Sequence, residues 1–146
     1  MPRITETASI ARDPETLWNE IGAFGSVGDW HPLLDSVEVL GYGTGALRIA
    51  HAKEGSEQVE RLEALDPERR LYCYTVEDTS MPVRDYRGEF RIESAGDAAS
   101  LVVWSAVFEL TPDGDGRTVE SVRQFLHAGA EGLRHRFGEA LLGDAL

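Results

Sequence analysis

The end of the chain carries one long amphipathic stripe, and this feature constrains the fold more than any other. Its apolar positions recur every three or four residues, as on one face of a helix. They are Val122, Leu126, Gly129, Leu133 and Phe137. A helix of about 20 residues is about 30 Å long, which is enough to run along a small sheet. We expect Thr118 to cap its start, and we expect the stripe to be buried against a sheet.

Two glycines interrupt this helical stripe. Gly129 and Gly132 lie in the helix interior, where each costs about 1 kcal/mol relative to alanine. Their presence predicts that a neighbouring segment or a ligand approaches the helix backbone closely. We therefore include Gly129 among the candidate ligand-binding residues.

The middle of the chain is patterned as a series of β-strands. In the clearest case, Tyr86 and Phe90 face one way and Arg87 and Glu89 the other, the alternation of a half-buried strand. Together with a strand near the start, the expected strands cover residues 5–10, 37–40, 46–52, 56–65, 71–77, 83–92 and 101–110.

Two short helices are expected after the first strand. Asp13 followed by Pro14 predicts a helix start, because aspartate caps free N–H groups and proline suits the first turn. Apolar residues at helical spacing continue to Phe24, and Gly25 is expected to end the helix. A further helical turn is expected over residues 26–30. The order predicts an α+β fold, in which a curved antiparallel sheet of about seven strands packs on the long C-terminal helix.

Composition excludes several classes of function. The 146 residues fit one domain, 1–146. With 14 basic and 26 acidic residues the net charge is −12, which disfavours nucleic acid and anionic lipid as partners. We find neither a bilayer-spanning apolar run nor a signal peptide. The one cysteine, Cys73, is read as a small apolar filler, and its lack of a disulfide partner predicts a cytoplasmic protein. The histidines have no metal-ligand spacing, so neither metal nor cofactor is expected.

Several short motifs occur in an order that resembles a known superfamily. They are DPETLW (residues 13–18), GDWHP (28–32), GTGALR (43–48), VERLEALD (59–66), LYCY (71–74), MPVRDY (81–86) and VWSAVF (103–108). On these motifs the chain resembles the START-like (SRPBCC) superfamily, which includes bacterial polyketide cyclase/dehydrase proteins and birch-allergen-type proteins. The resemblance implies a helix-grip fold and a single START-like ligand-binding domain, with a cavity between the sheet and the long helix. Members range from cyclases and aromatases to lipid carriers and hormone receptors, so the fold does not choose among functions.

Arg48 and Glu60 lie on neighbouring expected strands. If Arg48 shares the inward face with Ala50, its guanidinium bonds Glu60 inside the cavity and presents spare donors to a ligand oxygen. Such a pair is either functional or a buried ion pair that only neutralises itself. A register shifted by one residue instead places Leu47 inward and Arg48 in solvent. The sequence leaves both registers open.

Trp30 and His31 follow the short helices, where the resemblance places the cavity opening. His31, beside Asp29, is a candidate for proton transfer, because an ordinary histidine pKa of about 6.5 suits that role. In the alternative reading, Trp30 fills the core and His31 with Pro32 shapes a turn.

Aromatic residues are expected to share the inward face of the sheet and the helix stripe. They are Tyr72, Tyr74, Tyr86, Phe90, Trp104 and Phe125. Such a set is either ordinary core or the lining of a cavity for an apolar molecule.

Two functions follow from these residues. The first is the binding of a hydrophobic small molecule, for example an aromatic or polyketide-like one, by a monomer or homodimer. The second is a cofactor-free cyclase, aromatase or dehydratase, in which Arg48 polarises a carbonyl and Glu60, His31 or Tyr86 transfers a proton. A protein-interaction module is a third class, and its signature would be an exposed apolar patch outside the cavity.

Overall fold

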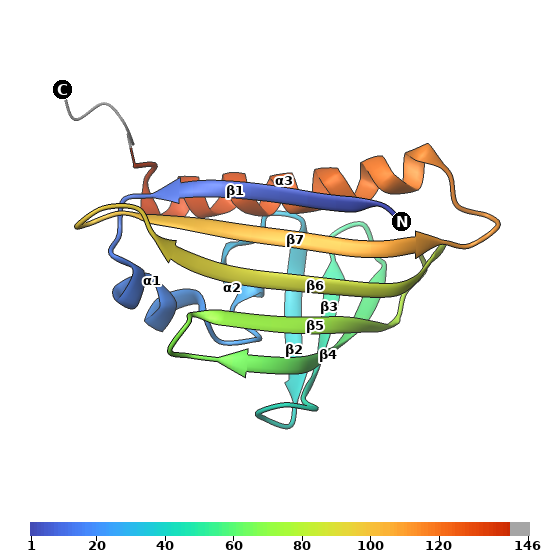
Figure 1. Ribbon diagram of the computed structural model, residues 1–146. Helices are drawn as coiled ribbons and strands as arrows, with labels where there is room; N and C mark the ends of the chain where they lie inside the picture. The colour runs from blue at the N-terminus through green and yellow to red at the C-terminus, as the bar shows by residue number, and fades with distance from the viewer. Residues whose placement is uncertain (141–146) are drawn as a thin grey trace.

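The computed structural model describes residues 1–140 and has the expected order of elements (Figure 1). The strands are β1 (Arg3–Ile10), β2 (Leu34–Leu40), β3 (Leu47–Ala52), β4 (Glu57–Asp66), β5 (Leu71–Asp78), β6 (Val83–Ser94) and β7 (Ser100–Leu110). The helices are α1 (Pro14–Ile21), α2 (Val27–Trp30) and α3 (Gly116–Phe137). The predicted α+β class is confirmed.

All seven strands form one antiparallel sheet in the order β1-β7-β6-β5-β4-β3-β2. The sheet bends so that β2 and β3 run behind β4 and β5 in the view of Figure 1. Irregularities of register interrupt β2, β4 and β6, and such bulges increase local bending and twist. The strong curvature leaves a concave face on which α3 packs, as the helix-grip expectation required.

The first helix ends earlier than the apolar spacing predicted. It stops at Ile21, and Phe24 lies in the turn that follows. The hydroxyl of Ser26 donates to the carbonyl oxygens of Ile21 and Ala23, at 2.5 and 2.8 Å. These bonds satisfy carbonyls that another helical turn would have used. Phe24 therefore enters the interior from a turn.

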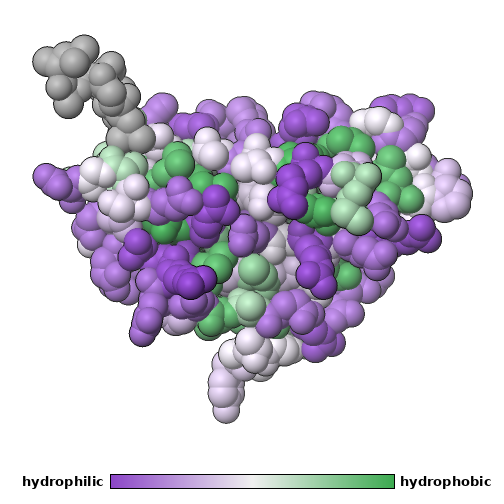
Figure 2. All heavy atoms as spheres, viewed as in Figure 1, coloured by the Kyte–Doolittle hydropathy of each residue, from purple (hydrophilic) through white to green (hydrophobic). Residues whose placement is uncertain are grey.

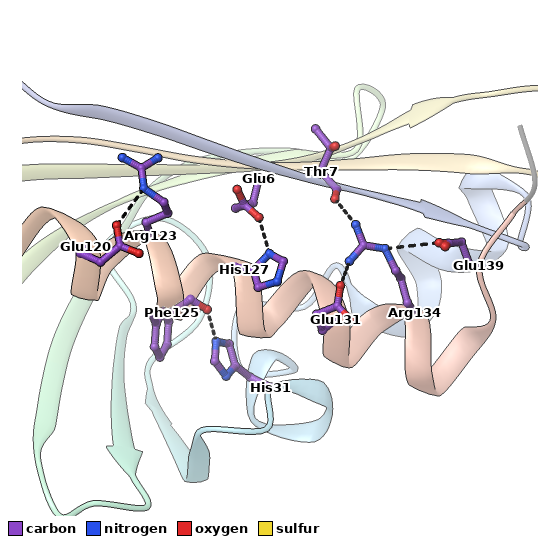
Figure 3. Close-up of polar contacts among 10 residues, drawn as sticks. All are labelled: Glu6, Thr7, His31, Glu120, Arg123, Phe125, His127, Glu131, Arg134 and Glu139. Carbon is purple, nitrogen blue, oxygen red and sulfur yellow. Dashed lines mark hydrogen bonds and ion pairs between the residues drawn. The ribbon is translucent and has the colours of Figure 1, made fainter.

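The long helix begins before the residue expected to cap it. Asp115 is the N-cap, and Thr118 is its partner in a capping box. Figure 3 shows how α3 is tied to β1 along its length. His127 Nδ1 contacts the Glu6 carboxylate at 2.8 Å, and Arg134 donates to the carbonyl oxygen of Thr7 at 2.8 Å. These contacts hold α3 at the β1 edge of the sheet.

The predicted alternation of β6 is confirmed, since Tyr86, Gly88, Phe90 and Ile92 are all buried. Gly88 has a specific role: a Cβ there would overlap the ring of Tyr74 on the neighbouring strand. On the face shown in Figure 2, hydrophilic side chains are interspersed with small hydrophobic areas. Within residues 1–140, no helix has the length and apolar character needed to cross a membrane.

Candidate ligand cavity

The register of β3 places Arg48 inside the protein. Arg48 is directly opposite Glu60 on β4, and the two residues are only 1% and 6% exposed. Arg48 Nε donates to Glu60 Oε1 at 2.5 Å. Leu47 and Ile49 lie on the other face of the strand and are half-buried. The structure thus resolves the register question in favour of the inward pair.

The guanidinium of Arg48 is held on several sides. Its Nη1 donates to the carbonyl oxygen of Phe24 at 2.7 Å and to the hydroxyl of Tyr72 at 3.1 Å. The rings of Phe24 and Tyr74 lie 4.2 and 4.6 Å from its central carbon, within the range of cation–π attraction. Burial alone would lower the pKa of Arg48, but the negative charge of Glu60 and the nearby tyrosines raise it above its ordinary value. Arg48 is therefore a fixed cation.

A chain of hydrogen bonds runs outward from this pair. Gln58 Nε2 donates to Glu60 Oε2 at 2.7 Å, and Gln58 Oε1 accepts from the hydroxyl of Thr79 at 2.9 Å. The backbone N–H of Met81 donates to Thr79 Oγ1 at 3.2 Å. The chain links the β5–β6 turn to the buried arginine and fixes the side chain of each member.

A cavity of about 520 Å³ lies beside these hydrogen-bonded side chains, between β3, β4, the β5–β6 turn and the N-terminal half of α3. Its polar lining includes Arg48, Gln58, Glu60, Thr79 and Tyr86. Its apolar wall includes Val27, Leu34, Ala50, Met81, Val122 and Phe125. The exposed residues Lys53, Glu54 and Glu57 are at its mouth. The volume falls within the range typical of small-molecule sites, about 300–1,000 Å³.

Tyr86 lines the cavity with a hydroxyl that donates to no partner among the described residues. Its ring is 5% exposed and stacks on Phe108 at 5.4 Å. Burial raises the pKa of Tyr86 above its ordinary value and Glu60 adds to the shift, while Arg48 opposes it. The hydroxyl therefore stays protonated and is free to donate to a bound molecule.

Several residues expected to line the cavity instead pack together as an aromatic centre. Trp30 stacks on Phe90 at 5.7 Å and meets Trp104 edge-on at 5.7 Å, and Phe90 stacks on Tyr72 at 5.2 Å. The indole N–H of Trp104 donates to the Tyr74 hydroxyl at 2.9 Å. Of the expected aromatic residues, Tyr86, Trp104 and Phe125 line this cavity. The interior is thus filled at its middle and hollow toward β3 and β4.

The close neighbours of Gly129 and Gly132 are parts of the protein. A Cβ on Gly129 would lie 2.5 Å from the Trp104 ring and 3.0 Å from that of His31. A Cβ on Gly132 would overlap the carbonyl oxygen of Trp30 and lie 2.9 Å from Pro32. The sequence predicted that either a neighbouring segment or a ligand approaches these glycines, and the structure shows a neighbouring segment at both.

His31 is buried between α3 and the aromatic centre, and it is not among the residues that line the cavity. Its Nε2 contacts the carbonyl oxygen of Phe125 at 2.8 Å, as drawn in Figure 3. Its Nδ1 accepts from the backbone N–H of Leu33 at 3.1 Å. Because both ring nitrogens are engaged by main-chain groups, this geometry supports the structural reading of His31 over a proton-transfer role.

Burial lowers the pKa of His31 to about 4, against an ordinary value of 6.5; the carbonyl of Phe125 opposes the shift and the charge of Arg48 adds to it. Between pH 6.5 and 4 the unfolded chain binds a proton at His31 that the folded protein does not. The stability contributed by neutral His31 is therefore complete above pH 6.5 and is lost as the pH falls toward 4, by about 3 kcal/mol in total.

We expect His31→Gln to flatten the dependence of unfolding free energy on pH between 6.5 and 4, relative to the parent protein. Urea unfolding at half-unit pH steps measures this slope. His127→Gln is the control, because the side chain of His127 on α3 is 59% exposed, and it should change the slope less than His31→Gln does. Equal slopes for the parent and His31→Gln would show that His31 is not buried as a neutral ring.

The sequence matches the family described as "Polyketide cyclase / dehydrase and lipid transport" over residues 1–138. The chain belongs to this family. Among solved structures it is similar to the protein XoxI from Bacillus cereus, with 27% identity and a TM-score of 0.87 over 94% of this chain and 96% of that one. No curated protein sequence matches the chain.

Two more distant structures share the fold. The Zhui aromatase/cyclase from a Streptomyces species is 22% identical, with a TM-score of 0.71 over 92% of this chain and 95% of that one. Norcoclaurine synthase from Thalictrum flavum, in complex with dopamine and hydroxybenzaldehyde, is 18% identical, with a TM-score of 0.70 over 92% and 85%. At these identities the likeness establishes the architecture of the family and not a shared reaction.

Other residues with reactive side chains lie away from this cavity. Cys73 is half-buried on the outer side of the sheet, and burial, with Glu89 nearby, raises the pKa of its thiol. His51 contacts Glu38 and Glu57 at 2.9 and 3.1 Å near the surface. Within residues 1–140, no three His, Cys, Asp or Glu side chains are grouped so as to hold a metal ion.

Some cavity residues were not singled out from the sequence. Gln58 is two positions before Glu60 on β4, so the alternation of a strand already places it on the same face. Ala50, which the sequence already placed on one face with Arg48, lines the cavity as well. Thr79 and Met81 belong to a turn, where no such rule applies, and only the fold brings them to the cavity.

Proposed function

We propose that the cavity of this family member binds a small, uncharged, hydrophobic molecule, aromatic or polyketide-like, that presents a carbonyl or hydroxyl oxygen at its inner end. The observation that carries the proposal is the buried Arg48–Glu60 pair at the closed end of a largely apolar cavity. Apolar walls favour a hydrophobic body, while a few convergent polar groups fix its orientation.

The electrostatics favour an uncharged molecule. Glu60 already neutralises Arg48, so an anion entering the cavity would have to compete with a carboxylate bonded at 2.5 Å. The mouth carries Glu54 and Glu57 against the single cation Lys53 of the described lining, so its local charge is negative. Together with a net charge of −12 this repels anions.

Hydrogen bonding favours an oxygen at the inner end. The bonds of Arg48 to Glu60, Phe24 and Tyr72 use three of the five donors of a guanidinium. The remaining donors and the free hydroxyl of Tyr86 would be left unpaired beside an entirely apolar ligand, which costs free energy. A carbonyl or hydroxyl oxygen supplies the missing acceptor.

The proposal is tested with a matched pair of probes, 2-acetylnaphthalene and 2-ethylnaphthalene, which differ in one carbonyl oxygen. We expect the acetyl compound to bind about two- to tenfold more tightly, as one net hydrogen bond allows. Tyr86→Phe should reduce this preference, because it removes the hydroxyl and keeps the ring on Phe108. Fluorescence titration measures both affinities.

Ala50→Phe is the second variant, because it fills the cavity from β3 and leaves Arg48, Glu60 and Tyr86 themselves unaltered. We expect it to weaken binding in this cavity at least tenfold, and circular dichroism checks that the fold persists. Binding at this cavity that is unchanged by Ala50→Phe, or equal affinities for the two probes, would contradict the proposal.

A second candidate is cofactor-free cyclase, aromatase or dehydratase chemistry, favoured by the family description and by a carboxylate and guanidinium in one apolar cavity. Glu60 would remove a proton next to a carbonyl polarised by Arg48, and the enolate carbon would attack a second carbonyl of the same molecule. The alkoxide formed there would take the proton back from Glu60. Both oxygens of Glu60 already accept hydrogen bonds, which occupy part of its acceptor capacity and hold it against Arg48, so we rank binding first. Cyclisation of a linear poly-β-ketone, reduced at least tenfold by Glu60→Gln, would establish catalysis; no conversion by the parent protein would exclude it for that substrate.

A further inference from the structure

A second cavity of about 550 Å³ opens to solvent beyond Arg48, and Val39, Tyr42 and Leu65 in its lining are exposed. It is formed by the turn after α1, the β2–β3 hairpin and the neighbouring parts of β4 and β5. Its apolar lining includes Phe24, Val39, Ala46, Leu62, Leu65 and Tyr72. It shares no lining residue with the first cavity.

Arg48 is the partition between the two cavities. Three successive inward positions lead past it: Ala46 lines the second cavity, Arg48 follows, and Ala50 lines the first. Arg48 Nε bonds Glu60 of the first cavity, while its Nη1 bonds Phe24 and Tyr72 of the second. The buried arginine is thus fixed from both sides, and the cavities are separate spaces. Small alanines on either side of it explain why both spaces exist.

The hairpin beside the second cavity carries an exposed aromatic ring on a glycine-rich tip. Tyr42 lines the cavity and is 95% exposed. Gly41, Gly43 and Gly45 all have positive φ, and a Cβ on either of the last two would meet nothing within 4 Å. The base of the tip is anchored, since the N–H of Gly45 donates to the carbonyl oxygen of Leu62 at 2.8 Å, while the exposed ring of Tyr42 has room to turn over an occupant. Burial of this ring would recover apolar area that is now in contact with water.

The lining also restricts the charge of an occupant. The charged residues around the cavity are Glu20 and Asp29, both acidic, and they add to the protein's net charge of −12. The buried wall is aromatic, with Phe24 and Tyr72 in edge-to-face contact at 5.6 Å. Rings of this kind favour another aromatic ring as a partner.

We propose that the second cavity is a separate binding site for a small aromatic molecule that carries no negative charge, with Tyr42 covering the bound ring. The site does not depend on the ligand proposed for the first cavity. Because Arg48 separates the two spaces, a molecule in each is expected to bind independently.

The test counts bound molecules of 2-acetylnaphthalene by native mass spectrometry. The parent protein should bind two. Ala46→Phe fills the second cavity and Ala50→Phe the first, so each variant should bind one, and the double variant none. If the parent protein lacks only the molecule that Ala50→Phe should displace, the proposal for the first cavity fails. If it lacks only the molecule that Ala46→Phe should displace, the proposal for the second cavity fails.

Affinity measurements in the Ala50→Phe background examine the second site alone. Tyr42→Ala should weaken binding there by about threefold or more, since it removes one aromatic contact; Tyr42 is exposed, so this variant should fold even if Ala46→Phe does not. 2-Naphthoate, the anionic analogue, should bind at least about tenfold more weakly than 2-acetylnaphthalene. Unchanged binding in Tyr42→Ala, or a preference for the anion, would overturn the proposal. Size-exclusion chromatography tests a different occupant. If the ligand-free protein is a dimer and Tyr42→Ala dissociates it, a second copy of the protein covers this surface, and the proposed ligand site is overturned.

Discussion

Glu60→Ala should lower the free energy of unfolding by about 3–5 kcal/mol, the range for breaking a buried ion pair. The variant leaves Arg48, which is 1% exposed, without its counter-charge. Arg48 cannot lose its proton to relieve the cost, and its remaining bonds are to the carbonyl of Phe24 and the hydroxyl of Tyr72, which are neutral. Urea unfolding at pH 7 measures the loss.

A matched surface pair provides the control. Arg84 and Glu109 contact each other at 3.1 Å, but their side chains are 64% and 36% exposed, so Glu109→Ala should cost less than about 1 kcal/mol. If Glu60→Ala cost no more than Glu109→Ala, the arginine would have found solvent or another anion, and the buried pair could not be the fixed feature that we describe.

Removing both charges should have a much smaller effect than removing one. In the double variant Arg48→Met, Glu60→Leu no buried charge is left uncompensated, and apolar replacements of such pairs are often neutral or stabilising. We expect its unfolding free energy to lie within about 1 kcal/mol of the parent value. A stable double variant that no longer prefers 2-acetylnaphthalene over 2-ethylnaphthalene would indicate that the pair is retained for binding rather than for folding.

The fold could be predicted because its signals are periodic. The alternation along β6 and the helical stripe of α3 each extend over many residues. A single residue that departs from the pattern therefore does not change whether a strand or a helix is predicted. Boundaries were less certain: the apolar spacing continues to Phe24, but the hydroxyl of Ser26 ends α1 at Ile21. Side chain-to-main chain bonds of this kind carry no periodic signal.

The position of Arg48 could not be predicted, because local hydrophobicity favours the opposite register. Leu47 and Ile49 are more apolar than Arg48 and Ala50, yet they lie half-buried on the outer side of β3. What holds Arg48 inside is a set of partners from other elements: Glu60 on β4, Phe24 after α1 and Tyr72 on β5. The cavities likewise depend on the space that the curved sheet leaves opposite Ala46 and Ala50. That space exists only in the assembled fold.

The second large effect is expected at Gly132, where alanine should destabilise the protein despite its higher helix propensity. In an exposed helix interior, Gly→Ala stabilises by about 1 kcal/mol. At Gly132 the added methyl group would overlap the carbonyl oxygen of Trp30 and crowd Pro32. The carbonyl belongs to the backbone and cannot rotate away, so α3 has to move outward. Overpacking of this kind costs about 1–3 kcal/mol, and we expect a net loss of about 2 kcal/mol.

Gly116→Ala is the matched control, because Gly116 begins the same helix and a Cβ there would meet nothing within 4 Å. It should leave the unfolding free energy unchanged or raise it by up to about 1 kcal/mol. Opposite signs at the two positions in urea unfolding would show that Gly132 is required by the approach of the segment after α2. An equal gain at both would mean that α3 does not pack as closely as described. An outward shift of α3 would also move Val122 and Phe125, which line the first cavity, so Gly132→Ala should weaken 2-acetylnaphthalene binding there while Gly116→Ala leaves it unchanged.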